Sequence, residues 1–495
     1  MNPEKPTLNR RKFLGTTAGA VAAFSILPSQ VIAGLGHRPP SDKLNIAGIG
    51  VGGMGYRNLK HMDTENIVAL CDVDEAYAGR NSFREWPLAA RYKDFREMFD
   101  KQKNIDAVMI ATPDHTHALP ALMAMRQGIH VFLQKPLTHS VFESRVLTET
   151  ARKYGVATQM GNQGNSGEGI RQICEWIWAG KIGEITRVDA WTNRPIWPQG
   201  LERPARDMRI PKTLDWDLFI GPAKYRPYHE VYTPWNWRGW WDFGTGALGD
   251  MACHILDPVF KALKLEYPSA VQASSTPVNT ESAPNAEIVV YDFPARDNLP
   301  KVAMPPVTVS WYDGGLMPPR PDELEIGEQM GDADGGCIFH GTKGRIMCGT
   351  YAKNPTLLPT REMAHFEQPV KSIRRIANAM KGGHEQDWIR ACKEMPQNRV
   401  EASSNFDYAG PLNEMVVMGV LAVRLQSLQR KLVWDGAAMR FTNISDRDQL
   451  KVLTKDRFEV INGDPRFNKD FTSLPAKQMA EDWIRHNHRQ GWEQI

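Results

Sequence analysis

The sequence predicts an α/β fold whose first half is a doubly wound parallel sheet and whose second half is built differently. Three observations predict it. A glycine-rich turn joins a buried strand to a helix near residue 50, apolar strands then alternate with helices as far as residue 160, and the pattern changes after residue 161. Strands that alternate with helices of this length are typical of parallel sheets covered by helices on both faces.

The first strand and the first helix flank a glycine motif. The segment "LNIAGI" reads as a buried strand, and "GYRNLKHM" opens a helix. Between them, Gly48, Gly50 and Gly53 satisfy the spacing G-x-G-x-x-G. In this motif the first glycine permits a tight turn, the second lets the backbone approach a pyrophosphate, and the third lets helix and strand pack closely. Its place between a strand and a helix predicts a dinucleotide site.

The second strand supplies a carboxylate at the position that this site requires. "NIVALCDVD" reads as a strand with Asp72 at its carboxyl end, about 20 residues after the glycines. A carboxylate there accepts the ribose hydroxyls of NAD and repels the extra phosphate of NADP. The alternative is that Asp72 caps the next helix. Its position favours the ribose role, so we expect NAD as cofactor.

A third unit, "IDAVMIATPDHTHALPALMAMRQGIHVFLQKP", reads as strand, helix and strand. Ligands of such sheets bind beyond the carboxyl ends of the strands, where "TPDHTH" and "QKP" fall. The further cofactor contacts that we expect are therefore Thr112, Pro113, His117 and Gln134. His115 and His117 are a conceivable metal pair, but no Cys or carboxylate cluster accompanies them, and we expect no metal.

The N-terminus is typical of a twin-arginine export signal. Arg10 and Arg11 precede a mildly apolar run, and small residues precede an expected cleavage near Ala33. We therefore expect a signal peptide at residues 1–33, a linker at 34–42 and a periplasmic protein. The alternatives, a basic amphipathic helix or a membrane anchor, are disfavoured because the run is short and only weakly apolar. The twin-arginine route carries folded proteins, which favours a cofactor bound before export.

Composition narrows the possible partners. The chain carries a formal net charge of +3, and the one acidic and four basic residues of the expected signal account for all of it. A nearly neutral remainder argues against nucleic acid or an anionic membrane surface as partner, and no other segment is long and apolar enough to span a bilayer. The six cysteines are scattered without a C-x-x-C motif, which excludes a disulfide scaffold and a zinc ribbon and leaves a single oxidised pair open.

Taken together, these motifs resemble the Gfo/Idh/MocA oxidoreductases, the family of glucose–fructose oxidoreductase and inositol dehydrogenase. The resemblance rests on "GIGVGG", Asp72, "ATPDHTH", "QKP" and "GDMACHILD", and it covers nearly all of residues 43–495. Segments such as "NWRGWWDFGTGALGDMACH" resemble an exported branch of predicted sugar dehydrogenases. The resemblance implies an NAD-binding Rossmann domain at 43–160. It also implies an α+β domain with a mainly antiparallel open sheet at 161–495, which binds substrate and pairs subunits into a homodimer or homotetramer.

The resemblance also implies a catalytic set. Asp250 and His254 lie four apart on a helix expected to begin near Asp250, and so share one face. For an isolated pair, the better interpretation is an Asp that caps the helix and a His that packs in the core. The nicotinamide site predicted upstream, together with the resemblance, favours a catalytic role for this pair. With Lys135 they form the expected catalytic set, and the base among them stays open. The family's usual Glu-Lys-Pro is here Gln134-Lys135-Pro136, which removes a charge beside Lys135.

Tryptophans are concentrated just before this helix. Seven of the fifteen fall between residues 191 and 241. Aromatic faces pack against the C–H faces of pyranose rings, so we expect a sugar platform formed by Trp237, Arg238, Trp240 and Trp241. Core packing or a subunit interface is the alternative for more than half of the seven.

The expected activity is NAD-dependent oxidation of a hydroxyl of a sugar or glycoside, with C3 as one candidate position, by a tightly bound and internally recycled cofactor. An alternative is a redox-neutral, NAD-dependent glycoside hydrolase that acts by oxidation and elimination, as some relatives do. A non-catalytic sugar- or nucleotide-binding protein is a third alternative, disfavoured because Lys135, Asp250 and His254 are all present. The sequence does not identify the sugar, the carbon or the electron acceptor.

Overall fold

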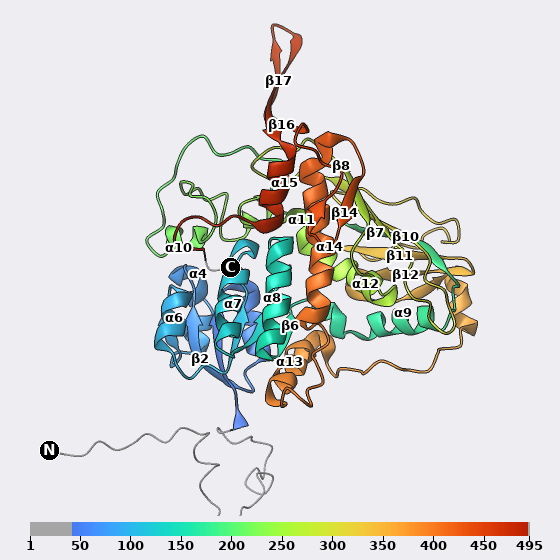
Figure 1. Cartoon of the computed structure of the whole chain (residues 1–495), viewed down its shortest axis with the longest axis horizontal. Helices are drawn as coiled ribbons and strands as arrows, with labels where there is room; N and C mark the ends of the chain where they lie inside the picture. Colours follow the sequence, from blue (N-terminus) through green and yellow to red (C-terminus); the bar gives the residue numbers. More distant parts are fainter. Residues whose placement is uncertain (1–41, 494–495) are drawn as a thin grey trace, which may run out of the picture. The chain divides into compact units, whose positions relative to one another are not determined.

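The computed structural model describes residues 42–493, and residues from Leu44 onward form one compact unit (Figure 1). The predicted export signal at 1–33 and residues 34–41 of the predicted linker lie outside the described residues. The main cluster of buried apolar side chains extends through both halves, because it includes strand residues such as Val108 and Val309.

The first half is a six-stranded sheet in the order β3-β2-β1-β4-β5-β6, with every neighbouring pair parallel. Its strands are β1 (Asn45–Ile49), β2 (Asn66–Cys71), β3 (Ala90–Tyr92), β4 (Ala107–Ile110), β5 (His130–Leu133) and β6 (Thr158–Met160). Its helices are α3 (Gly53–His61), α4 (Glu75–Gly79), α5 (Ser82–Glu85), α6 (Phe95–Lys101), α7 (Ala118–Arg126) and α8 (Val141–Tyr154). The strand order reverses between β1 and β4, which creates the crevice where such sheets bind ligands. The predicted doubly wound sheet is confirmed.

Local sequence explains these elements. β4 is the continuous apolar run "AVMI", fully buried, as a central parallel strand requires. α8 begins with a capping box, in which the hydroxyl of Ser140 accepts the backbone N–H of Glu143 and the carboxylate of Glu143 accepts that of Ser140. It ends at Gly155 in the left-handed conformation (φ 62°).

The second half is a nine-stranded sheet in the order β13-β12-β11-β7-β10-β9-β8-β14-β15. Its strands are β7 (Ile185–Thr192), β8 (Ala270–Ser275), β9 (Glu287–Phe293), β10 (Val307–Tyr312), β11 (Gly335–Gly341), β12 (Gly344–Gly349), β13 (Thr356–Leu358), β14 (Leu432–Asp435) and β15 (Arg440–Phe441). All neighbouring pairs are antiparallel except β7 with β10. The predicted mainly antiparallel sheet is confirmed.

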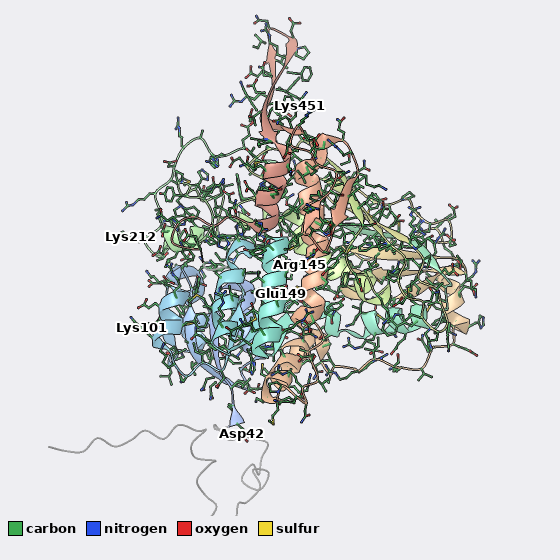
Figure 2. All side chains as sticks on the ribbon, in the orientation of Figure 1. Asp42, Lys101, Arg145, Glu149, Lys212 and Lys451 are labelled. Atoms are coloured by element: carbon green, nitrogen blue, oxygen red, sulfur yellow. The ribbon has the colours of Figure 1, made fainter. Side chains whose placement is uncertain are left out.

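The remaining helices cover this sheet and return to the first one. They are α9 (Glu168–Trp178), α10 (Trp216–Ile220), α11 (Gly246–Ile255), α12 (Asp257–Ala262), α13 (His384–Lys393), α14 (Phe406–Leu425) and α15 (Ala476–Arg485). α14 packs against β8 and β9 and also against α8, where Arg145 forms an ion pair with Glu414 (Figure 2). The first sheet ends with β6 at the predicted domain boundary, yet α13 and α14 pack against the first half.

All six cysteines are free and buried. Cys337 on β11 and Cys348 on β12 are register partners in an antiparallel pair, and their Sγ atoms lie 3.3 Å apart. If one pair of cysteines oxidises, as the sequence leaves open, Cys337 and Cys348 are the pair that this geometry favours.

A long hairpin, β16 (Gln449–Ile461) and β17 (Asp464–Pro475), projects from the rest of this unit (Figure 1). Its turn contains Asn462 and Gly463, both with positive φ (54° and 89°), the sequence most typical of a tight hairpin. Several apolar side chains on it are exposed, including Phe467 at 70%. The sequence analysis does not predict this hairpin. Among the described residues, no helix has the length and apolarity to cross a membrane.

Candidate functional site

The glycine turn follows β1 directly. Gly50 has φ +71°, and a Cβ there would lie 2.6 Å from the carbonyl oxygen of Ala111. Gly55, on α3, approaches the turn closely, because a Cβ there would lie 2.0 Å from the oxygen of Gly50. Gly48 is a residue of the β1 strand, and a Cβ there would lie 2.9 Å from Leu59 of α3. Gly50, Gly52 and Gly55 therefore form a second G-x-G-x-x-G register that starts at the end of the strand, two residues after the predicted register of Gly48, Gly50 and Gly53. The end of the strand decides between the two registers.

Asp72 follows β2 and lies against this turn. One carboxylate oxygen accepts the backbone N–H groups of Val51 (2.9 Å) and Gly52 (3.3 Å), and the other accepts that of Asp74 (2.9 Å). Burial raises the pKa of Asp72 to about 6, against the opposing effect of these N–H donors. The residue that caps α4 is Asp74, whose side chain accepts two backbone N–H groups, so the capping alternative for Asp72 does not hold.

Thr112 and Pro113 follow β4 on the same edge of the sheet. The hydroxyl oxygen of Thr112 is buried and has no hydrogen-bond partner among the described residues. A buried hydroxyl without a partner is costly, which indicates a site built for a further ligand. Pro113 directly precedes the 3₁₀ turn η2 (Asp114–Thr116) and aims the chain away from the sheet.

The two histidines of "TPDHTH" connect loops to one another. The ring nitrogens of His117 lie 2.8 Å from the oxygen of Pro136 and 2.9 Å from that of Thr112. Those of His115 contact the carbonyl oxygens of Phe243 and two residues of α10. Burial lowers the pKa of each imidazole to about 4. His117 therefore joins the loop after β4 to the loop after β5. Both ring nitrogens of each histidine face carbonyl oxygens, so neither ring presents a free nitrogen to a metal.

Gln134 belongs to a buried polar network. Its amide nitrogen donates to the side-chain oxygen of Asn58 (2.9 Å), and the amide nitrogen of Asn58 donates to Glu385 on α13 (2.7 Å). A glutamate at position 134 has no N–H to offer Asn58 and adds a second carboxylate near Glu385. This network gives a physical reason for the glutamine, and it directs the Gln134 side chain inward.

Lys135, Asp250 and Arg238 form one ion cluster. The ammonium group of Lys135 donates to the carboxylate of Asp250 (2.6 Å) and to its backbone oxygen (2.9 Å). Nε of Arg238 donates to the same carboxylate oxygen at 3.1 Å. Burial alone would raise the pKa of Asp250, but the two cations hold it well below its usual range. Asp250 is therefore an anion that positions Lys135, and two cations already engage its carboxylate.

His254 lies one turn after Asp250 on α11, which begins at Gly246 and not near Asp250 as predicted. Its Nδ1 is buried without a hydrogen-bond partner among the described residues, and its ring contacts Tyr351 edge-on (centroids 4.6 Å apart). Burial, and secondarily Lys135, lowers the pKa of His254 to about 3. The imidazole is neutral at physiological pH, so a proton acceptor lies beside the Lys135 cation.

Two residues of this site are not identified by the sequence analysis. Asp114 is buried and accepts a hydrogen bond from Thr245, directly before α11 (2.7 Å). Burial raises its pKa to about 7. Tyr351 has φ +62° in the 3₁₀ turn η5 (Thr350–Ala352), and no local motif marks it. Asp114 is the middle residue of "PDH", so the motif that predicts the neighbouring cofactor contacts could also have indicated Asp114.

The tryptophans divide into an exposed group and a core group. The guanidinium of Arg238 lies between Trp235 and Trp237, 3.9 and 4.2 Å from their ring centroids, and Trp235 is 47% exposed. Trp240 and Trp241 are only 1% and 4% exposed, and each indole N–H donates to a backbone oxygen. The predicted sugar platform of Trp237, Trp240 and Trp241 is therefore largely buried, with Trp241 lining a separate cavity, and Trp235 is the exposed face beside Arg238.

A parallel sheet with a glycine turn at its switch point, and a lysine–carboxylate pair beyond a neighbouring strand, define a dinucleotide-dependent oxidoreductase. Residues 44–162 match the oxidoreductase family Gfo/Idh/MocA in its NAD-binding Rossmann fold, and residues 176–292 match that family's C-terminal α/β domain. The chain belongs to the Gfo/Idh/MocA family, and its first half is an NAD-binding domain.

Curated relatives share part of this chain. A "Glycosyl hydrolase family 109 protein" of Shewanella pealeana is 30% identical over 210 residues, which cover 37% of this chain and 45% of the relative. The "scyllo-inositol 2-dehydrogenase (NAD(+))" of Bacillus subtilis is 30% identical over 164 residues, covering 32% of this chain and 45% of the relative. Each match therefore spans less than half of the curated relative.

A solved structure shares the fold over most of the chain. The WlbA dehydrogenase of Bordetella pertussis, in complex with NADH and UDP-GlcNAcA, aligns with a TM-score of 0.52 at 16% identity. The alignment covers 79% of this chain and 99% of that one. At this identity the likeness concerns the arrangement of the two sheets.

Proposed function

We propose that this protein oxidises a hydroxyl group of a sugar or glycoside with a tightly held NAD. One observation carries the proposal. The Lys135 ammonium, with two of its three N–H donors held by Asp250, lies beside the neutral imidazole of His254. The third donor has no partner within residues 42–493 and is available for a substrate oxygen. A fixed cation next to a proton acceptor suits the conversion of an alcohol to a ketone.

The residues of the first half fit NAD. Gly50 and Gly52 bring the backbone close to the start of α3, and Asp72 retains acceptor capacity beside the turn. The unpartnered hydroxyl of Thr112 lies on the same edge. Bound NAD supplies the hydride acceptor, and the carboxylate of Asp72 favours it over NADP.

Side chains of this protein remove the proton of the substrate hydroxyl and stabilise the charge that develops on its oxygen. Lys135 donates a hydrogen bond to the substrate oxygen and stabilises the negative charge that develops there. The hydroxyl proton passes to the neutral imidazole of His254. Asp250 keeps its charge throughout and, together with Arg238, fixes Lys135 in place. Trp235, exposed beside Arg238, offers a face for the sugar ring.

A redox-neutral glycoside hydrolase is the second candidate. The observation that favours it is the match to proteins named glycosyl hydrolase family 109. In this reaction the ring hydroxyl is oxidised, the acidified neighbouring proton leaves, the aglycone is eliminated, water adds, and the ketone is reduced again. Both candidates share the first oxidation, so they use the same cluster.

Product analysis on a panel of glycosides tests the proposal. Purified protein is incubated with each glycoside, and mass spectrometry detects a keto product or a released aglycone. Lys135→Met and His254→Gln should each lower kcat by about 100-fold or more while NAD stays bound. Trp235→Ala should mainly raise KM, because it removes binding shared by the ground and transition states. Full turnover by His254→Gln would refute its role as proton acceptor, and no product from any glycoside would count against both candidates.

Location and assembly are part of the same proposal. The paired Arg10 and Arg11 support export by the twin-arginine route to the periplasm, and Lys at both positions should leave unprocessed precursor in the cytoplasm. A homodimer or homotetramer is expected from the resemblance, and the exposed apolar hairpin offers surface for association. Light scattering that gives a monomer mass at micromolar concentration would contradict the proposed assembly.

A further inference from the structure

A cavity of about 400 Å3 lies apart from the Lys135 cluster. α14 and α15, which pack against each other (Figure 1), form one side of it, and the segments 223–226 and 241–245 contribute to another. Its apolar wall consists of Val417, Val420, Leu421, Val452, Leu474 and Met479. Its volume falls in the range of small-molecule sites. None of Lys135, Asp250 and His254 lines it.

Arg424, in the last turn of α14, lines this cavity with its charge uncompensated. Its guanidinium carbon lies 3.8 Å from the ring centroid of Trp483 and 5.2 Å from that of Trp241. No hydrogen bond or ion pair joins it to another residue within 42–493. Burial lowers the pKa of Arg424 to about 9, and Asp242 offsets this only in part. Five N–H donors of a guanidinium are therefore available at the wall of a cavity.

The other charges around the cavity favour an anion. Four arginine and lysine side chains line it, Arg203, Lys224, Arg226 and Arg424, against two carboxylates, Asp242 and Asp482. Arg203 and Arg226 are already paired with carboxylates. Lys224 is exposed and, like Arg424, forms no ion pair in the described part of the chain. Within residues 42–493, two cations and one carboxylate, Asp482, thus remain without an ion pair at the cavity, which leaves an excess of positive charge for a ligand.

We propose that this cavity binds a small organic anion, whose carboxylate or phosphate pairs with Arg424 and whose ring or apolar body packs against Trp241 and the wall of α14. A guanidinium edge matches either group with two parallel hydrogen bonds. Trp241 and Trp483 hold the guanidinium by their faces, which leaves its edge for the ligand. Lys135, Asp250 and His254 do not line the site, although Thr245, the partner of Asp114, does. The proposal is independent of the proposed function.

Thermal shift and tryptophan fluorescence test this on the full protein saturated with NAD, so that the phosphate-binding turn is already filled. The probes are glucuronate, glucose 6-phosphate and benzoate, with glucose as neutral counterpart and inorganic phosphate as the bare anion. At least one organic anion should raise the unfolding temperature where glucose does not. A response to glucuronate and benzoate alone identifies a carboxylate ligand, and a response to glucose 6-phosphate alone identifies a phosphate ester.

Arg424→Met should abolish the response and, because it removes a half-buried cation that has no ion pair in the described part of the chain, should not lower the unfolding temperature of the ligand-free protein. Lys224→Gln should lower the affinity for the organic anion by about tenfold. The matched control is Lys212→Gln, an exposed lysine outside the cavity (Figure 2), which should bind as wild type. If Arg424→Met does not fold, the comparison of the two lysine variants decides. No response to any organic anion, equal binding of glucose, a response to inorganic phosphate alone, or equal behaviour of the two lysine variants would overturn the proposal.

Discussion

Replacing Thr112 by valine should have opposite effects on the free protein and on cofactor binding. The hydroxyl of Thr112 is buried without a partner, and valine has nearly the same shape without it. Burial of an unpaired hydroxyl costs about 1–3 kcal/mol, so the NAD-free variant should be as stable as wild type or more stable by up to that amount. If the hydroxyl bonds NAD, the variant loses the same interaction in the complex. The affinity for NAD should then fall by about 5- to 150-fold.

Two measurements check this prediction. Differential scanning calorimetry of the NAD-free protein gives the stability change, and calorimetric titration with NAD gives the affinity. Thr116→Val is the matched control, because the hydroxyl of Thr116 donates to the oxygen of Pro113 (3.0 Å). That variant should lose stability and keep its NAD affinity. A Thr112→Val protein with unchanged NAD affinity would show that Thr112 does not touch the cofactor, and a less stable NAD-free variant would show that the hydroxyl has a partner.

Three further predictions follow from backbone, charge and thiol geometry. Gly50→Ala should lower both the stability and the NAD affinity, because its Cβ would meet backbone atoms. Gly128 has a similar φ of +76° but open space around it, so Gly128→Ala should lower the stability only by the conformational strain. Unfolding experiments and NAD titrations of the two variants measure both quantities. Burial opposes both shifts, but His486 and then His488 lower the pKa of Glu143 from its usual 4.5, and Glu143 raises the pKa of His488 from its usual 6.5. The stabilisation from this cluster is therefore full between these values, fades as pH falls through the lowered pKa of Glu143, and fades as pH rises through the raised pKa of His488. Unfolding of Glu143→Gln against wild type across pH should show the largest difference in that window, and a flat difference would contradict it. Refolding with oxidised glutathione should join the two cysteines that face each other across β11 and β12, leaving four free thiols by alkylation and mass spectrometry; six free thiols would contradict it.

Sequence predicts this fold well where a signal is local. Alternation of apolar strands and helices identifies the first sheet, and the position of Asp72 after a strand predicts its place beside the glycine turn. Local signals fail where two arrangements share one pattern. The run "GIGVGGMG" satisfies the glycine spacing in two registers, and only the end of β1 at Ile49 separates them. Likewise, the density of tryptophans does not reveal that Trp240 is buried while Trp235 is exposed.

The rest of the site depends on contacts between distant segments. Lys135 meets Asp250 across 115 residues, and the resemblance rather than any periodicity pairs them in advance. The sequence predicts a sugar contact for Arg238 but not that its guanidinium also bonds Asp250 and lies between two tryptophans. Tyr351 reaches His254 from a turn with no motif of its own. Such placements follow from the packing of the second sheet, which sequence patterns describe only as strands.

The return of α13 to the first sheet determines when that sheet is complete during synthesis. The amide N–H of Asn58, on the first helix after the glycine turn, has its acceptor on Glu385, 327 residues later in the chain. Glu143 similarly meets His486 across 343 residues. A nascent chain that stops before α13 therefore exposes part of the surface that holds the dinucleotide half together. The dinucleotide half therefore reaches its full set of contacts only after these late segments have left the ribosome.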